Sequence, residues 1–391
     1  MSQTTPSFGK WRSIFWPVYT FELKKLVPML IIAFCIAFNY TILRDTKDTI
    51  VVSAIDELAL PFLKLFGTLP VAILFMLAYA KMSNLVKRET LFYITIVPFI
   101  VFFFLFATVL YPLKDALAPH ETAAWLLSIS PEGFHSAIKC IENWTLSLFY
   151  ILSELWGSAV LSLLFWGFAN EIVRTGEAKR FYTLFTMGFN LAHIFSGPLI
   201  WFFSMYGKRV SDLGGDAWQI SLNYLMGMVV LSGLIIIGAY WWMNRNVLTD
   251  LRFYDPEHDK VKHKVKLKMG VMEGLLVLAR SKYLLCIALL VIGYGMSINL
   301  VEVVWKGQLK LQFPNENDYS AFMGMFSLFT GIFTILMTFV GGYIIRNRTW
   351  GQAASLTPMA LLITGIAFFT FIVFRNHVAG YIAWIGTTPV M

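Results

Sequence analysis

The chain consists of long apolar runs separated by short polar segments. Each run approaches or exceeds the roughly 20 apolar residues that an α-helix needs to cross a bilayer. Complete runs occupy residues 26–43, 59–80, 91–110, 144–169, 181–203, 219–242, 282–304, 319–345 and 352–374. A further run begins near residue 379 and stops at Met391 without room for a full span. The pattern predicts an all-α polytopic membrane protein that is incomplete within its tenth helix.

Lysine and arginine residues are distributed unevenly between the two sides of this predicted topology. If the N-terminus is cytoplasmic, 21 of the 31 Lys and Arg residues fall in cytoplasmic segments. Cytoplasmic loops of membrane proteins carry an excess of these residues. The distribution therefore predicts a cytoplasmic N-terminus, and it supports the number of runs because one missed helix would disturb the alternation.

The longest loop divides the runs into two groups. Residues 243–281 follow the sixth run and contain the basic segment VKHKVKLKMG at 261–270. Six helices, a long basic loop and further helices are the layout of major facilitator transporters, which have a 6+6 helix architecture. We therefore expect a cytoplasmic segment 1–25, a six-helix bundle 26–242, a cytoplasmic loop 243–281 and an incomplete C-terminal bundle 282–391.

Composition and charge exclude several classes of protein. The chain is 58% hydrophobic and 14% charged, whereas soluble domains carry about 25% charged residues. The net charge of +8 lies mainly between the apolar runs, so topology explains it better than nucleic-acid binding. The three cysteines show no CxxC or Cys/His metal spacing, and we expect neither a disulfide framework nor a bound metal or other cofactor. Without a GxxxxGK[ST], HExxH or GxSxG motif, an ATP-hydrolysing pump, a zinc protease or a lipase is not indicated, and we expect no enzyme.

Charged residues within the apolar runs are the candidates for function, because each costs roughly 2.5–3.5 kcal/mol at the centre of a membrane helix. The first group closes the first run, where Arg44, Lys47 and Asp48 share a helical face by their i, i+3, i+4 spacing. Neighbouring cations can bind phosphates, and Asp45 and Asp48 can pair with them when the site is empty. The alternative is an ordinary charged helix end at the outer interface.

Two further groups lie in other runs. Glu154 stands about ten residues inside the fourth run, where it can contact substrate, bind a proton or form a structural salt bridge. Asn299, Glu302 and Lys306 follow an i, i+3, i+7 pattern in the seventh run, the counterpart of the first run in a six-helix repeat. Polar groups on counterpart helices indicate a shared central site.

One weaker candidate lies in the fifth run. Asn190 can read a base edge or simply bridge helices, and the sequence does not separate these roles. His193, on the same run, is expected to be a hydrogen-bonded residue of the bundle.

Three long ungapped stretches resemble the nucleotide transporter family, the ATP/ADP translocases of obligate intracellular bacteria and plastids. They are FNYTILRDTKDTIVV (38–52), SELWGSAVLSLLFWGFANEI (153–172) and GYGMSINLVEVVWKGQLK (293–310). The resemblance implies that Lys47, Glu154 and Glu302 belong to the nucleotide site. A further lysine of the family belongs to a later helix than the runs present here. The short N-terminus resembles the bacterial members, so the resemblance implies the cytoplasmic (inner) membrane of an intracellular bacterium.

This resemblance predicts an antiporter that exchanges ATP for ADP by alternating access. ATP and ADP are the expected partners, with phosphate as a further candidate, in a monomer embedded in the lipid bilayer. Arg44 and Lys47 would neutralise the phosphates, and Glu154 and Glu302 would hold the cations in the empty carrier. Open alternatives are a proton-coupled nucleotide importer and an exchanger of other nucleotides such as GTP or NAD. A membrane enzyme or receptor is a third alternative, which no catalytic motif supports.

Overall fold

The computed structural model describes residues 18–210, 216–250, 253, 276–277 and 279–374. The basic segment 261–270 and the run predicted from residue 379 lie outside these residues. The described part of the chain contains helices and no strand, so the predicted all-α class is confirmed.

The helices of the N-terminal half cover the first six predicted runs and the loops between them. The first three spans are η1 (Thr20–Glu22) with α2 (Leu23–Ala54); α3 (Ala59–Phe62) with η2 (Leu63–Thr68) and α4 (Leu69–Leu85); and α5 (Arg88–Leu105) with η3 (Phe106–Leu110). Short helices follow: α6 (Lys114–Leu117), α7 (His120–Ile129), η4 (Glu132–Phe134) and α8 (His135–Glu142). The next three spans are α9 (Trp144–Trp156) with η5 (Gly157–Phe165) and α10 (Trp166–Ile172); α11 (Thr175–Val210); and α12 (Ala217–Asn246). Of these, η2, η3 and η5 are π-helical.

In the C-terminal half, the described residues form three long helices, α15 (Lys282–Gln312), α16 (Glu316–Asn347) and α17 (Trp350–Val373). Polar side chains fix where several helices begin: Asp216 accepts hydrogen bonds from the backbone at the start of α12, and Asn315 does the same for α16. Such caps satisfy amide groups that the first helical turn leaves unpaired.

Eight helical segments within the described residues are long and apolar enough to cross a membrane. They correspond to eight of the nine predicted runs. The exception is α11, which is long enough but carries more polar residues, among them Asn190 and His193. It packs against α2, α12 and α16, so its polar groups face other helices as well as the surroundings.

Helix α2 forms the centre of the N-terminal bundle. It packs against α9, α11 and α12, and most of its side chains are buried. Interhelical hydrogen bonds add to this packing: Asn39 Nδ2 donates to the carbonyl of Val229 at 3.0 Å, and Ser232 Oγ donates to that of Cys35 at 3.2 Å. The central position of α2 therefore buries most of its surface, its charged residues Asp45, Lys47 and Asp48 included.

The two halves meet mainly where α11 runs beside α16. A Cβ atom on Gly197 would lie 2.5 Å from the carbonyl oxygen of Gly324, and one on Gly324 would lie 2.6 Å from that of Gly197. Glycine at both positions is therefore what lets the two backbones touch. Further along the same contact, Ser204 Oγ donates to Ser320 Oγ at 2.9 Å and Lys208 forms a 2.8 Å ion pair with Asp318.

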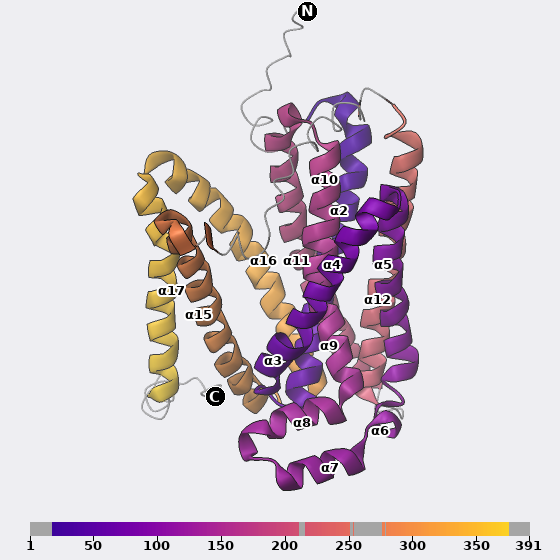
Figure 1. The fold of residues 1–391 in the computed structure, drawn as a ribbon, viewed down its shortest axis with the longest axis vertical. Coiled ribbons are helices and arrows are strands. Elements are labelled where there is room, and N and C mark those ends of the chain that lie inside the picture. The colour runs from indigo at the N-terminus through magenta and orange to yellow at the C-terminus, as the bar shows by residue number, and fades with distance from the viewer. Residues whose placement is uncertain (1–17, 211–215, 251–252, 254–275, 278, 375–391) are drawn as a thin grey trace, which may run out of the picture.

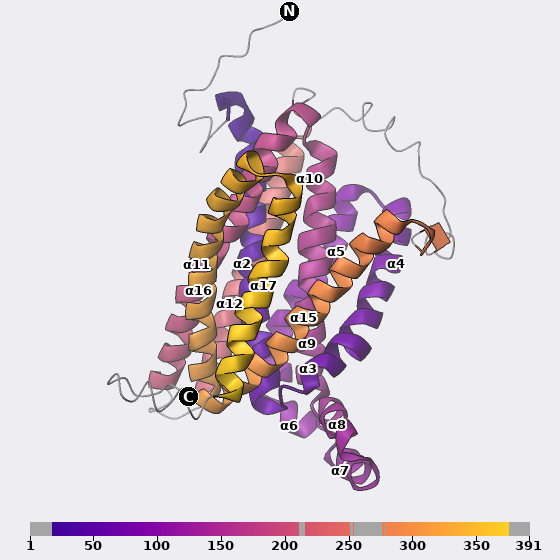
Figure 2. The same ribbon diagram turned by 90° about the vertical axis from the view of Figure 1, so that its left-hand side faces the viewer.

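Helix α15 approaches the N-terminal bundle at one end only. Its first half is largely exposed, whereas Lys306 and Leu309 near its C-terminal end are buried. Figure 1 shows α15 and α17 standing apart from the main bundle at the end where the chain starts, and α15 converging on α3 and the end of α2 at the other. Figure 2 shows the oblique path of α15 and the α7–α8 hairpin at the end opposite the N-terminus.

Candidate functional site

Lys47 is the first of the predicted site residues and lies on α2. Its Nζ atom is 2.8 Å from Asp48 Oδ1 and 3.0 Å from Glu154 Oε2 on α9. The ammonium group also lies 4.2 Å from the ring centroid of Tyr150, a cation–π contact. The Lys47 side chain is 3% exposed, so two carboxylates and an aromatic ring replace its hydration.

Asp48 connects this group to the C-terminal half. Its second oxygen, Oδ2, lies 2.7 Å from Lys306 Nζ on α15. Lys306 in turn lies 2.6 Å from Glu302 Oε1, one helical turn earlier. One carboxylate on α2 therefore joins a lysine from each half of the molecule.

Lys64 extends the arrangement at its other end. Its Nζ atom lies 2.6 Å from Glu302 Oε2 and 2.9 Å from Asn299 Oδ1. Lys64 belongs to the π-helical segment η2, and π turns are frequent at functional sites. Lys64 is not among the residues predicted from the sequence, although a cation a few residues inside an apolar run has the same cost in lipid as the residues that are.

Six charged side chains thus form a single line in which acid and base alternate. In order they are Glu154, Lys47, Asp48, Lys306, Glu302 and Lys64. Three negative and three positive charges cancel. The structure therefore brings the predicted groups around Lys47, Glu154 and Glu302 together in one charged cluster from α9, α2, α15 and η2. In the buried middle part of the line, formed by Lys47, Asp48 and Lys306, removing one charge leaves its partners uncompensated.

Arg44 lies one helical turn before Lys47 and forms a smaller cluster. Its Nε atom donates to Asp45 Oδ1 at 3.0 Å, and Nη2 donates to Ser327 Oγ on α16 at 2.8 Å. Ser327 Oγ donates to Asp45 Oδ2 at 2.6 Å. This cluster also joins the two halves, and its guanidinium is partly exposed.

Asn190 is not placed with the other candidates. Its side-chain amide donates to the carbonyl of Thr186 on the same helix, and the residue is half-buried. A role in reading the base stays a prediction. His193 makes the local contacts expected of a bundle residue, with Nδ1 3.2 Å from the carbonyl of Phe189 and 3.3 Å from Thr41 Oγ1.

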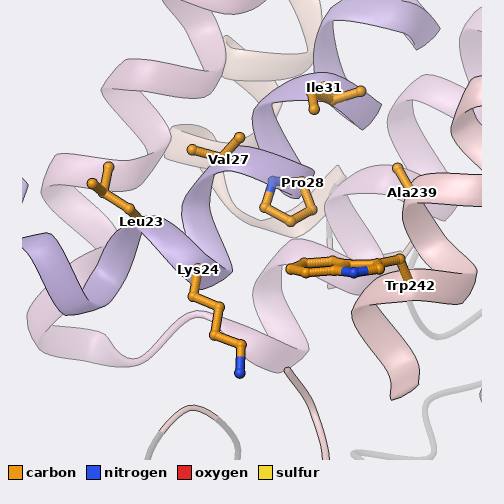
Figure 3. A pocket seen from close by; sticks show the side chains of 7 residues that line it. All are labelled: Leu23, Lys24, Val27, Pro28, Ile31, Ala239 and Trp242. Carbon is orange, nitrogen blue, oxygen red and sulfur yellow. The ribbon is translucent and has the colours of Figure 1, made fainter. Parts of the chain in front are cut away.

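A pocket between α2 and α12 lies away from the charged line (Figure 3). Its lining is Leu23, Lys24, Val27, Pro28, Ile31, Ala239 and Trp242. Lys24 is the one charged residue among them, so the pocket lacks the several donors that a polyphosphate needs. Across the described residues, no group of three His, Cys, Asp or Glu side chains could hold a metal ion.

Comparisons with known proteins agree with this picture. The family model described as TLC ATP/ADP transporter matches residues 1–391. The chain is 53% identical over 388 residues to ADP,ATP carrier protein 1 of Chlamydia pneumoniae, covering 98% of this chain and 75% of that protein. It is 48% identical over 371 residues to the chloroplastic ADP,ATP carrier protein 2 of Arabidopsis thaliana, covering 94% and 59% respectively.

A more distant relative is ADP,ATP carrier protein 1 of Rickettsia prowazekii, with 40% identity over 368 residues that cover 94% of this chain and 73% of the relative. No solved structure matches the chain. The whole-length family match and the level of identity show that this multi-pass membrane protein belongs to the TLC ATP/ADP transporter family.

Proposed function

We propose that the protein exchanges ATP for ADP across a membrane by alternating access. Its relatives in Chlamydia, Rickettsia and plants bear the name ADP,ATP carrier or ATP/ADP transporter. The observation that carries the proposal is the line of alternating charges, which joins both halves of the molecule inside helices apolar enough to cross a bilayer.

The line gives a physical reason for exchange. In the empty protein the carboxylates of Glu154, Asp48 and Glu302 neutralise the lysines and hold α2 against α15. A nucleotide brings roughly three to four negative charges, and its phosphates compete with these carboxylates for the same cations. An empty carrier that must break buried ion pairs to change conformation does so slowly. A loaded carrier has phosphates in place of the lost partners, so nucleotide is needed in each direction.

The arrangement of the helices supports one conformational assignment. α15 is exposed along its first half and contacts α2 near Lys306, so the halves are joined at the end of the molecule opposite the N-terminus (Figure 1). With a cytoplasmic N-terminus, as the distribution of Lys and Arg favours, this is an inward-facing state that is closed on the outer side. We place the protein as a monomer of the major-facilitator layout in the inner membrane of an intracellular bacterium.

The central test of the site is Lys47→Ala. Since this change removes a cation that two carboxylates hold in place, we expect ATP uptake by cells or vesicles carrying the variant to be abolished. The matched control is Lys24→Ala, which removes an exposed lysine near the start of the same helix. Near-normal uptake by Lys47→Ala, at equal amounts in the membrane, would remove Lys47 from the mechanism.

The identity of the exchanged nucleotides is a separate test. Competition by unlabelled GTP, other ribonucleotides or NAD against labelled ATP measures the range of substrates. We expect ADP to compete most strongly, because it is the exchange partner. Uptake that follows a proton gradient without internal nucleotide would instead assign Glu154 or Glu302 as a proton site.

A further inference from the structure

Lys64 differs from the other two lysines of the charged line in its accessibility. Lys47 and Lys306 each lie between two carboxylates, and their side chains are 3% and 2% exposed. Lys64 ends the line, pairs with the single carboxylate of Glu302, and is 28% exposed. An anion can therefore approach the Lys64 ammonium in this conformation, whereas Lys47 and Lys306 are covered.

The surroundings of Lys64 argue against a purely local structural role. The residue lies in an apolar segment, 59–85, that is long enough to cross a membrane, where a charge is costly. Its neighbours Leu65 and Phe66 are large, apolar and exposed. Its partner Glu302 already has a second lysine on its other carboxylate oxygen, at 2.6 Å. Glu302 therefore keeps a cationic partner when Lys64 turns to another anion.

Asn299 completes a short polar unit around the Lys64 ammonium. The Asn299 side chain accepts from Lys64 through Oδ1 and donates through Nδ2 to the carbonyl of Gly295 at 2.7 Å. The amide orientation is thus fixed by the helix that carries it. Lys64 is held by one neutral and one charged acceptor, and a phosphate oxygen can replace the charged one without leaving the ammonium unpaired.

We propose that Lys64 is a substrate-binding residue that donates to a phosphate of the nucleoside polyphosphate and releases Glu302 as it does so. This inference rests on the proposed exchange function and deepens it, because it names a cation that contacts the nucleotide phosphates in every bound state. Glu302 then stays with Lys306, and the phosphate takes its place on Lys64.

The test compares Lys64→Gln and Lys64→Arg in vesicles loaded with ADP. Loss of one charge-assisted hydrogen bond to a phosphate predicts a KM for ATP about 10- to 100-fold higher in Lys64→Gln. The maximal rate changes little, because the same contact is lost from every bound state. Lys64→Arg keeps a cation that binds phosphate and restores most of the affinity. Lys81→Gln, which neutralises an exposed lysine further along the same helical segment, is the matched control and leaves KM unchanged.

A second variant separates substrate binding from neutralisation of Glu302. If Lys64 only balances that carboxylate, the double change Lys64→Gln with Glu302→Gln restores the KM for ATP that Lys64→Gln has lost. If Lys64 binds phosphate, the double change leaves the affinity low. ATP-dependent thermal stabilisation of the purified variants measures the same affinity without transport.

The outcomes also separate this inference from the function on which it rests. A wild-type protein that shows no ATP/ADP exchange overturns the proposed function. Wild-type exchange together with an unchanged KM in Lys64→Gln, or with affinity restored in the double variant, overturns the role of Lys64 alone.

Discussion

Asp48 and Glu302 are the carboxylates of the charged line that contact lysines from both halves. Replacing Asp48, the more deeply buried of the two, with asparagine tests how the halves are held. Oδ1 lies 2.8 Å from Lys47 and Oδ2 lies 2.7 Å from Lys306, and the side chain is 3% exposed. Asn keeps the shape of the side chain and removes its charge. Lys47 keeps Glu154 and Lys306 keeps Glu302, but the link from α2 to α15 loses its ionic character.

The size of the effect follows from the burial of this link. Removing one partner of a buried ion pair costs about 3–5 kcal/mol. We take the lower end, because each lysine retains a second carboxylate. Since roughly 1.4 kcal/mol corresponds to a tenfold change in an equilibrium constant, about 3 kcal/mol predicts a shift of about 100-fold toward separation of α2 and α15 in the empty carrier.

The assay is uptake of labelled ATP into vesicles preloaded with ADP and into vesicles left empty. For the wild type we expect uptake to depend strongly on internal ADP. For Asp48→Asn we expect the ratio of loaded to empty uptake to fall toward one, because the empty carrier can now change conformation. The control is Glu177→Gln, which removes the carboxylate 2.7 Å from buried Lys25 within the N-terminal bundle and leaves the ratio unchanged. A folded Asp48→Asn variant that still requires internal ADP would refute this account of the link.

Two further predictions concern regions outside the charged line. The Oγ atoms of Ser204 and Ser320 are 2.9 Å apart across the contact of α11 with α16. The double variant Ser204→Cys with Ser320→Cys should form a disulfide under oxidation. This cross-link should block ATP uptake, and reduction should restore it. The hydrogen bond of His120 to Glu142, at 2.8 Å, raises the pKa of the imidazole above its usual 6.5. The α7–α8 hairpin should therefore resist proteolysis best below about pH 6.5 and lose that protection as the pH rises through the raised pKa.

Each of these predictions has its own control. Cysteine at position 232 lies against native Cys35 of α2 within one bundle, so a disulfide there should leave uptake intact. If the cross-link between α11 and α16 has no effect either, these helices do not separate during transport. His120→Ala should remove the pH dependence of proteolysis, and a dependence that persists in this variant would assign it to another group.

Much of the architecture could be predicted from the sequence because the length of an apolar run is set by the bilayer. All nine complete runs are helical. The cost of charge within lipid selects Lys47, Glu154 and Glu302 as candidates, and the structure brings them into one charged line. The spacing of Arg44, Lys47 and Asp48 also predicts that they share one helical face. Arg44 and Asp48 contact residues of the C-terminal half, and Lys47 contacts Asp48.

Other features depend on how the helices rotate and pack, which periodicity does not determine. Lys64 stands near the start of an apolar run, where a cation resembles a helix-end residue, and a π-helical segment carries it to Glu302. Asp48 was expected to pair with cations of its own helix, and its contact with Lys306 requires the approach of α15. The close contact of Gly197 with Gly324 likewise joins residues far apart in the chain.

The most direct measurement of the proposed function is the dependence of ATP uptake on internal ADP for the wild-type protein in membrane vesicles. We expect strong stimulation by internal ADP and little uptake into empty vesicles at any proton gradient. Equal uptake into empty vesicles, driven by a proton gradient, would contradict obligate exchange and assign Glu154 or Glu302 to proton transport.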